Sequence, residues 1–332
     1  MSSNELITIS SLAYGGDGVG RLADGRVCFV SGALPQEQIE VEIICEKKRF
    51  VRGKIRKILL PSPERITPLC PHFTDDDCPG CAYINQTYES ELQWKQRQLT
   101  DFLLRSNLIE ADRILPPFAS PSRFGMRNKL TLHRQNGTTG YFGRDNKTVF
   151  ELERCLLAQE DLNLLIPEVK KGPDRRITLR QTGSDGAVIA GDKERMLTEN
   201  LPGFGDFQVA ADGFFQTNIA VAAEMIRRVV EYIRCSAVKN LAELYCGSGI
   251  FSICAAENIP ELQCTGIEIS EKAVSAAKIN AAKHQLSSRC RFFAGDAGKL
   301  LKKCSPSNDT VILIDPPRSG VMRSTLRQMA DR

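Results

Sequence analysis

The chain has 332 residues, which at roughly 100–200 residues per domain predicts two or three domains. Hydrophobic residues make up 42% and charged residues 25% of it, an ordinary globular composition that excludes collagen, a coiled coil and wholesale disorder. No apolar run approaches the roughly 20 residues of a membrane span, and the start, MSSNELITIS, lacks the features of a secretory signal. The net charge of +4 is too small to identify a partner, so local charge patterns have to be considered.

Residues 1–60 predict short strands separated by turns. Ile39, Val41 and Ile43 alternate with two glutamates, which is the period of a half-buried strand. About five such strands in so short a segment indicate a small, OB-like closed barrel.

A basic run follows at residues 47–57, where seven of eleven residues are Lys or Arg and none is acidic. Such a run is either a solvated strand edge or a nucleic-acid-binding face, and the interleaved Phe50 and Val51 favour the second. A second basic stretch lies at residues 123–134. From these two stretches we expect RNA contacts by Lys47, Lys48, Arg49, Arg52, Lys54, Arg56, Lys57, Arg123, Arg127 and Lys129.

The middle of the chain predicts a mixture of elements. Three prolines mark a linker at residues 61–68, and a helix is expected at residues 89–105. Strands are expected at residues 123–129, 140–142 and 149–155, whereas residues 160–210 are less informative. This segment therefore predicts a β-rich central domain.

From residue 212 onward the pattern changes to alternating helices and strands. Helices are expected at residues 219–233, 250–256 and 271–285, and strands at residues 241–245, 264–269, 291–293 and 311–314. This alternation predicts a parallel sheet of the doubly wound α/β class.

Polar residues follow the expected strands at the positions where such sheets bind ligands. Residues 243–251 read ELYCGSGIF, a strand, a glycine turn and a helix start. Glu268 lies nineteen residues after Gly249, where its carboxylate could bind ribose hydroxyls. Asp296 could accept a hydrogen bond from an adenine amino group. Because the P-loop and the third glycine of a dinucleotide site are both missing, the pattern indicates S-adenosylmethionine, with another ligand or pure packing as the alternatives.

Residues 314–318 read IDPPR after an apolar strand. The two prolines fix a rigid turn that directs Asp315 toward the glycine turn. The other reading is a simple strand-ending turn. Beside a methyl-donor site, however, Asp-Pro-Pro suggests methyl transfer to a base.

The chain has twelve cysteines, and several of them lie in apolar elements as reduced thiols would. Seven residues separate Cys70 from Cys78 and two separate Cys78 from Cys81, with Cys155 farther along. Four thiolates in this arrangement predict a zinc ion or an iron–sulfur cluster, and the spacing leaves the choice open.

Together these residues resemble the RNA uracil-5-methyltransferase family, and within it the 23S ribosomal RNA branch with an N-terminal TRAM domain and an iron–sulfur cluster. The resemblance covers essentially the whole chain. Residues 212–218, DGFFQTN, are similar to the family's Phe-x-Gln-x-Asn element, whose glutamine contacts S-adenosylmethionine. The resemblance implies a [4Fe–4S] cluster on Cys70, Cys78, Cys81 and Cys155. It also implies a cofactor site made of Gln216, Tyr245, Gly247, Gly249, Ile250, Glu268, Asp296 and Asp315. Ile250 replaces an asparagine of some members, so only its backbone is expected to contribute.

The resemblance also implies a covalent mechanism. A cysteine thiolate adds to carbon 6 of uracil, the resulting enolate attacks the methyl group, and a base then removes the proton from carbon 5 so that the enzyme is eliminated. Asp315 is expected to hydrogen-bond the edge of a uracil that has left its stack. The family's nucleophile lies in a Ser-Cys-Asn-Pro element beyond Asp-Pro-Pro-Arg and its glutamate base lies farther on, so we expect both beyond Arg332 and the methyltransferase domain to be C-terminally truncated.

We therefore expect a multidomain α/β protein with a TRAM barrel at residues 1–60, a β-rich, cluster-bearing RNA-binding domain at 61–205, and an incomplete doubly wound methyltransferase domain at 206–332. The expected protein is cytoplasmic and monomeric, and it methylates carbon 5 of a uridine in 23S ribosomal RNA. The alternatives are transfer RNA as the substrate, or a catalytically silent relative that only binds RNA.

Overall fold

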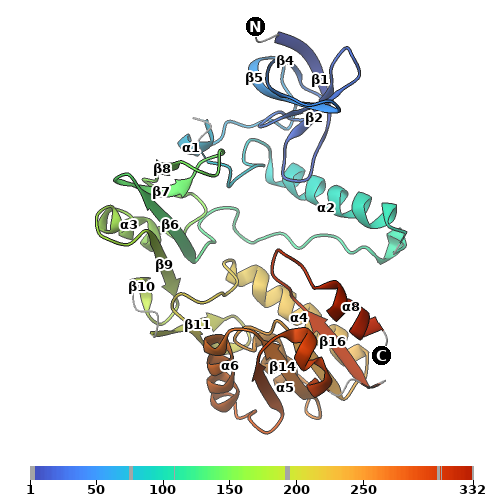
Figure 1. Ribbon diagram of the computed structural model, residues 1–332, viewed down its shortest axis with the longest axis vertical. Coiled ribbons are helices and arrows are strands. Elements are labelled where there is room, and N and C mark those ends of the chain that lie inside the picture. The colour runs from blue at the N-terminus through green and yellow to red at the C-terminus, as the bar shows by residue number, and fades with distance from the viewer. Residues whose placement is uncertain are drawn as a thin grey trace. The chain divides into compact units, whose positions relative to one another are not determined.

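The computed structural model describes residues 4–74, 78–107, 109–190, 195–304, 307 and 309–330 (Figure 1). The chain divides into two compact units, residues 1–119 with 141–150, and residues 120–140 with 151–332. This division differs from the three expected domains, because residues 61–119 group with the N-terminal barrel and most of the central segment groups with the C-terminal part.

The N-terminal strands form a closed barrel of order β1-β2-β3-β5-β4, which confirms the predicted barrel. Its strands are β1 (Asn4–Leu12), β2 (Gly18–Arg21), β3 (Val27–Val30), β4 (Gln38–Glu46) and β5 (Phe50–Leu60). Alternate residues such as Val41 and Val51 fill the interior. A Cβ atom at Gly53 would lie 2.1 Å from Val41 Cγ2, so only glycine allows β4 and β5 to pack here.

The segment after the barrel is tied to it by a buried ion pair. Arg65 Nη2 donates to Glu37 Oε2 at 2.8 Å and to the Gly32 carbonyl oxygen at 2.6 Å, and Glu37 is fully buried. The short helix α1 (Pro71–Thr74) and the 18-residue helix α2 (Tyr88–Arg105) follow, and the 3₁₀ turn η1 spans Ala111–Arg113. The side chain of Thr87 caps α2 by accepting from the Ser90 N–H, and the predicted helix at residues 89–105 is confirmed.

The central sheet has the strand order β10-β9-β6-β7-β8. Its elements are β6 (Lys129–Gln135), β7 (Thr138–Phe142), β8 (Val149–Glu151), β9 (Arg176–Thr182) and β10 (Gly186–Ile189), with α3 (Glu160–Leu165) and η2 (Pro167–Val169) between β8 and β9. The predicted strand at residues 123–129 is wrong, because β6 begins only at Lys129. Residues 124–128 instead bond to loops, as when the Arg127 N–H donates to the Leu157 carbonyl oxygen at 2.7 Å.

A hairpin and a long helix lead into the C-terminal sheet. The hairpin strands are β11 (Met196–Leu201) and β12 (Gly205–Ala210), and the helix is α4 (Ile219–Cys235), capped by the Asn218 side chain. The predicted amphipathic helix at residues 219–233 is thus confirmed.

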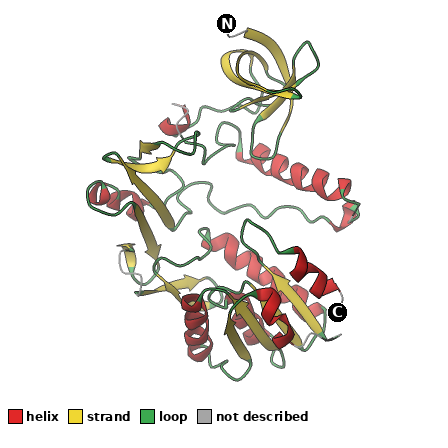
Figure 2. Cartoon of the chain, in the orientation of Figure 1, coloured by secondary structure: helices red, strands yellow, loops and turns green. Residues whose placement is uncertain are grey.

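The C-terminal part is a parallel four-stranded sheet of order β15-β14-β13-β16, and Figure 2 shows its strands in yellow with red helices beside them. Its strands are β13 (Asn240–Leu244), β14 (Gln263–Glu268), β15 (Cys290–Ala294) and β16 (Thr310–Ile314), and its helices are α5 (Ile250–Asn258), α6 (Glu271–Lys283), α7 (Ala297–Leu300), η3 (Leu301–Cys304) and α8 (Arg323–Ala330). Leu241 packs with α4, α5 and α6, whereas Leu244 packs with α7, η3 and α8. Helices therefore cover both faces of the sheet, as the predicted alternation requires. In the part of the chain that the structure describes, no helix is long and apolar enough to cross a membrane.

Candidate functional site

The carboxyl edge of the parallel sheet gathers three of the expected site residues. Leu244 is in register with Ile267 on one side and with Ile314 on the other. The next residues, Tyr245, Glu268 and Asp315, therefore lie at the same edge of three neighbouring strands. This is the position at which α/β sheets bind ligands.

The turn after β13 has three residues in the left-handed region, Tyr245 (φ 65°), Gly247 (φ 53°) and Gly249 (φ 77°). The two glycines have different roles. A Cβ atom at Gly249 would lie 2.6 Å from Phe292 Cζ, so this glycine allows α5 to pack closely on the sheet. A Cβ atom at Gly247 would meet nothing within 4 Å, so this glycine leaves open space in which a ligand can approach the backbone.

The carboxylate of Glu268 faces this turn. One of its oxygens accepts from the Gly247 N–H at 3.2 Å and the other accepts from the Ser270 N–H at 2.9 Å. Two backbone donors thus fix a half-buried carboxylate beside the open glycine. Because a carboxylate oxygen can accept further hydrogen bonds, the group fits a ribose diol.

Asp296 and Asp315 complete the edge. The Asp296 side chain accepts from the Lys299 N–H at 2.9 Å, which places its carboxylate at the start of α7. Burial raises the pKa of the Tyr245 hydroxyl, and the negative charge of Asp296 adds to this effect, so the two side chains lie within electrostatic range. Asp315 is exposed directly after β16.

Glu243 is a functional candidate that the sequence reading missed. It is 2% exposed in the middle of β13, and it accepts from the Ser252 N–H at 3.0 Å and from the Ser252 hydroxyl. Burial raises its pKa to about 7, against the lowering effect of the Ser252 hydrogen bonds, and Asp315 and Glu268 raise it further. An acidic residue inside an otherwise apolar strand was the signal in the sequence.

Gln216 and Ile250 lie on segments that meet in one apolar cluster. Phe215, the neighbour of Gln216, packs in a cluster that includes Ile219 and Ile250, and Ile250 is the first residue of α5. Gln216 itself is half-buried. The structure thus brings the segment with Gln216 to the start of the helix that follows the glycine turn.

The cysteines beside this site are poor nucleophiles. Cys246 and Cys254 are buried, and burial, increased by neighbouring glutamates, raises the pKa of both thiols well above the usual value. Cys304 is also buried, in the cluster beneath α7. A thiolate nucleophile requires the opposite shift.

The expected metal site is not seen in the described part of the chain. Among the residues that the structure describes, no group of three or more His, Cys, Asp or Glu side chains is close enough to hold a metal ion. The structure therefore does not show the cluster expected on Cys70, Cys78, Cys81 and Cys155.

The basic run of the barrel lies on its outer surface, partly compensated by acids. Along β5, Val51 and Gly53 point inward, whereas Arg52, Lys54, Arg56 and Lys57 are exposed. Arg52 pairs with Asp17 at 2.9 Å and Arg56 pairs with Glu42 at 2.8 Å. Lys47, Lys48 and Arg49 are exposed in the turn between β4 and β5.

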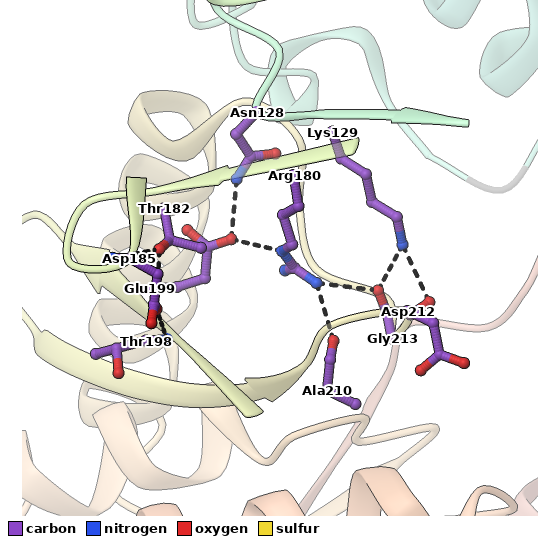
Figure 3. Close-up of polar contacts among 10 residues, drawn as sticks. All are labelled: Asn128, Lys129, Arg180, Thr182, Asp185, Thr198, Glu199, Ala210, Asp212 and Gly213. Carbon is purple, nitrogen blue, oxygen red and sulfur yellow. Dashed lines mark hydrogen bonds and ion pairs between the residues drawn. The ribbon is translucent and has the colours of Figure 1, made fainter. Parts of the chain in front are cut away.

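The residues of the second basic stretch differ in their surroundings. Arg123 lies over the ring of Phe124, 5.6 Å from its centroid, and Arg127 is half-buried. Lys129 turns inward, and its Nζ donates to the carbonyl oxygens of Asp212 at 3.2 Å and Gly213 at 2.6 Å (Figure 3). Lys129 therefore has intramolecular partners at the position where an exposed RNA contact was expected.

Comparisons with known proteins agree with this architecture. Residues 3–55 match the model of the TRAM domain, and residues 238–330 match the model of a methyltransferase domain. The chain is 27% identical to an uncharacterized RNA methyltransferase of Thermosynechococcus vestitus, with 96% of this chain and 84% of that protein covered. It is also 27% identical to one of Bdellovibrio bacteriovorus, with 99% and 81% covered.

A solved structure shares the fold along nearly the whole chain. The Pyrococcus abyssi tRNA (uracil-54, C5)-methyltransferase, in complex with S-adenosyl-L-homocysteine, has a TM-score of 0.68 and 19% sequence identity, and 99% of this chain and 87% of that one are covered. At this identity the match establishes the fold. The chain thus contains one segment that matches a TRAM domain and one that matches a methyltransferase domain, and it is similar along nearly its whole length to proteins named RNA methyltransferases.

Proposed function

We propose that the protein transfers a methyl group from S-adenosylmethionine to carbon 5 of a uridine in RNA, with 23S ribosomal RNA as its substrate. The observation that carries the proposal is the row of Tyr245, Glu268 and Asp315 at one sheet edge, with the Glu268 carboxylate held against Gly247. A carboxylate that can bind ribose, next to a glycine whose backbone a ligand can approach, is the arrangement expected for an adenosine ligand without a phosphate.

Some residues at this sheet edge bind the cofactor, and another binds the target base. S-adenosylmethionine, when bound, supplies an electrophilic methyl group. Glu268 binds its ribose, Asp296 binds its adenine, and Asp315 hydrogen-bonds the uracil edge. Phe214, which is 75% exposed and lies two residues before Gln216, offers a face on which an unstacked base can pack.

Carbon 5 of uracil becomes a nucleophile only after a thiolate has added to carbon 6. Buried Cys246 and Cys254 do not meet this need, so the proposal requires an accessible thiolate from elsewhere in the protein. Proton loss from carbon 5 and elimination of the thiolate would then restore the aromatic base.

Cofactor binding is tested first, by calorimetric titration of the full chain with S-adenosylmethionine. Glu268→Gln keeps the side-chain shape but removes the charge, and we expect about tenfold weaker binding, as for one lost charge-assisted hydrogen bond. Glu271→Gln is the matched control, because Glu271 is exposed in the first turn of α6. Equal affinities of the wild type and both variants would contradict the assigned site.

The reaction is tested with RNA that carries tritium at carbon 5 of uridine. Methylation at this carbon releases the tritium into water, whereas methylation of an oxygen or a nitrogen does not. We expect release from a 23S ribosomal RNA transcript. Release from transfer RNA alone would change the substrate, and binding of both ligands without release from either RNA would favour the catalytically silent alternative.

The cluster is proposed from the sequence resemblance alone. After anaerobic purification, the wild-type protein should contain iron and acid-labile sulfide. The Cys78→Ser variant should contain neither. Zinc without sulfide would favour the other reading of the spacing. A protein without either metal would contradict both.

A further inference from the structure

Lys129 and Arg180 are paired directly across the antiparallel strands β6 and β9. Like charges in directly opposed positions destabilise a sheet. Arg180 is fully buried and Lys129 is half-buried, so water screens the repulsion poorly. Such a pair needs a compensating interaction.

Both cations bond to the same stretch of backbone (Figure 3). Lys129 Nζ donates to the Gly213 carbonyl oxygen at 2.6 Å, and Arg180 Nη1 donates to the same oxygen at 3.2 Å. Lys129 also bonds to Asp212 O at 3.2 Å, and Arg180 also bonds to Ala210 O at 3.1 Å. The two side chains therefore hold residues 210–213 from one side, and we name this pair the cationic clamp.

One carboxylate balances the cationic clamp. Glu199 Oε1 accepts from Arg180 Nε at 2.9 Å and from Asn128 Nδ2 at 3.2 Å (Figure 3). Within the described part of the chain, Arg180 Nη2 and Asn128 Oδ1 are buried without a hydrogen-bond partner. Buried ionic groups that are incompletely paired contribute little to stability, so stability alone explains this network poorly.

The segment held by the cationic clamp continues directly to Gln216. The Arg180 guanidinium lies 5.8 Å from the ring centroid of Phe215, and the Asn128 N–H donates to the Thr217 carbonyl oxygen at 3.0 Å. Residues 213 and 217 are thus both fixed by the β6 region, and Gln216 lies between these two fixed points.

The same segment is connected to the glycine turn by a second buried side chain. Asn280 of α6 donates from Nδ2 to the carbonyl oxygens of Gln208 at 2.9 Å and Ser248 at 3.1 Å. Its Oδ1 accepts from the Gln208 N–H at 2.6 Å. Strand β12, which leads into residues 211–218, is therefore joined to the backbone of the glycine turn.

We infer that Lys129 and Arg180 are positioning residues for S-adenosylmethionine, holding the segment that carries Gln216 in its cofactor-binding conformation. This inference rests on the proposed function and gives Lys129 a role within the protein rather than on the RNA surface. Burial, with Arg180 and Arg176 adding to it, lowers the pKa of Lys129 to about 8 although Asp212 and Glu199 oppose the shift, which agrees with a desolvated side chain.

The test measures two affinities of the full chain, for S-adenosylmethionine and for RNA. Lys129→Met removes the donor, and we expect about tenfold weaker cofactor binding, with an unchanged salt dependence of RNA binding. Lys129→Arg keeps a charged donor and should restore most of the cofactor affinity. Lys171→Met is the matched control, because Lys171 is an exposed lysine of the same compact unit.

An RNA phosphate contact would give the opposite pattern. Lys129→Met would then lower the slope of log RNA affinity against log salt by about one and leave cofactor affinity unchanged, which would overturn the inference. Failure of Lys129→Arg to restore affinity would also overturn it. If Lys129→Met does not fold, Lys129→Gln replaces it, and unchanged cofactor affinity in that variant contradicts the inference. A wild-type chain that binds no S-adenosylmethionine would instead overturn the proposed function itself.

Discussion

Glu243 and Ser252 are joined by two hydrogen bonds beneath the candidate cofactor site. The Ser252 N–H and hydroxyl both donate to Glu243 Oε2, which connects the middle of β13 to the first turns of α5. Both residues are buried. The pair therefore fixes the helix that follows the glycine turn, and it places a titratable group where its charge is poorly solvated.

This burial predicts a stability that falls as the pH rises. The pKa of Glu243 rises from its ordinary 4.5 to about 7 on folding, so its contribution is fully present below pH 4.5 and is lost as the pH increases through about 7. The difference corresponds to at most roughly 3 kcal/mol. The free energy of unfolding, measured with denaturant, should fall less between pH 5 and pH 8 in Glu243→Gln than in wild type. An equal fall in both proteins would contradict the assignment of this pH dependence to Glu243.

The two glycines of the turn should respond differently to a methyl group. Gly249→Ala places Cβ 2.6 Å from Phe292 Cζ and strains a positive φ, so we expect a loss of about 2–4 kcal/mol in unfolding free energy. Gly247→Ala meets no atom within 4 Å and should lose only about 1 kcal/mol, from backbone strain. Its main effect should be weaker S-adenosylmethionine binding. Thermal melts and titrations of both variants check this difference, and equal destabilisation would contradict it.

The turn between β4 and β5 should contribute strongly to RNA affinity. Replacing Lys47, Lys48 and Arg49 by alanine should reduce the slope of log affinity against log salt by about 2, because each phosphate contact contributes roughly 0.7–0.9. In the matched control, alanine replaces Arg227, Arg228 and Arg234 of α4, which form ion pairs with Glu224 and Glu231. An equal effect of both triple variants would mean that only net charge matters.

Asn280 should be needed for both folding and cofactor binding. It is fully buried and bonds to β12 and to the glycine turn, so Asn280→Ala leaves several backbone groups without partners. We expect a loss of about 2–4 kcal/mol in the free energy of unfolding. Denaturant titration measures this loss. A loss below about 0.5 kcal/mol, which is typical of a surface substitution, would contradict a structural role of Asn280 between β12 and the glycine turn.

The sequence by itself determined the elements whose patterns are local. Alternating residues predicted the barrel, and the alternation of strands and helices after residue 240 predicted the parallel sheet. Because the carboxyl ends of parallel strands meet at one edge, the sequence also predicted that Glu268 and Asp315 would lie near the glycine turn.

Only the tertiary structure decided where individual side chains point. Residues 124–128 failed to form the predicted strand because their backbone groups bond to distant loops. Lys129 looked like a surface cation, but the register that pairs it with Arg180, 51 residues away, directs it to the backbone at residues 212–213. Burial of Glu243 likewise depends on helix α5, and the packing of Gly249 depends on Phe292. Such contacts join residues far apart in the sequence, so no local pattern in the sequence specifies them.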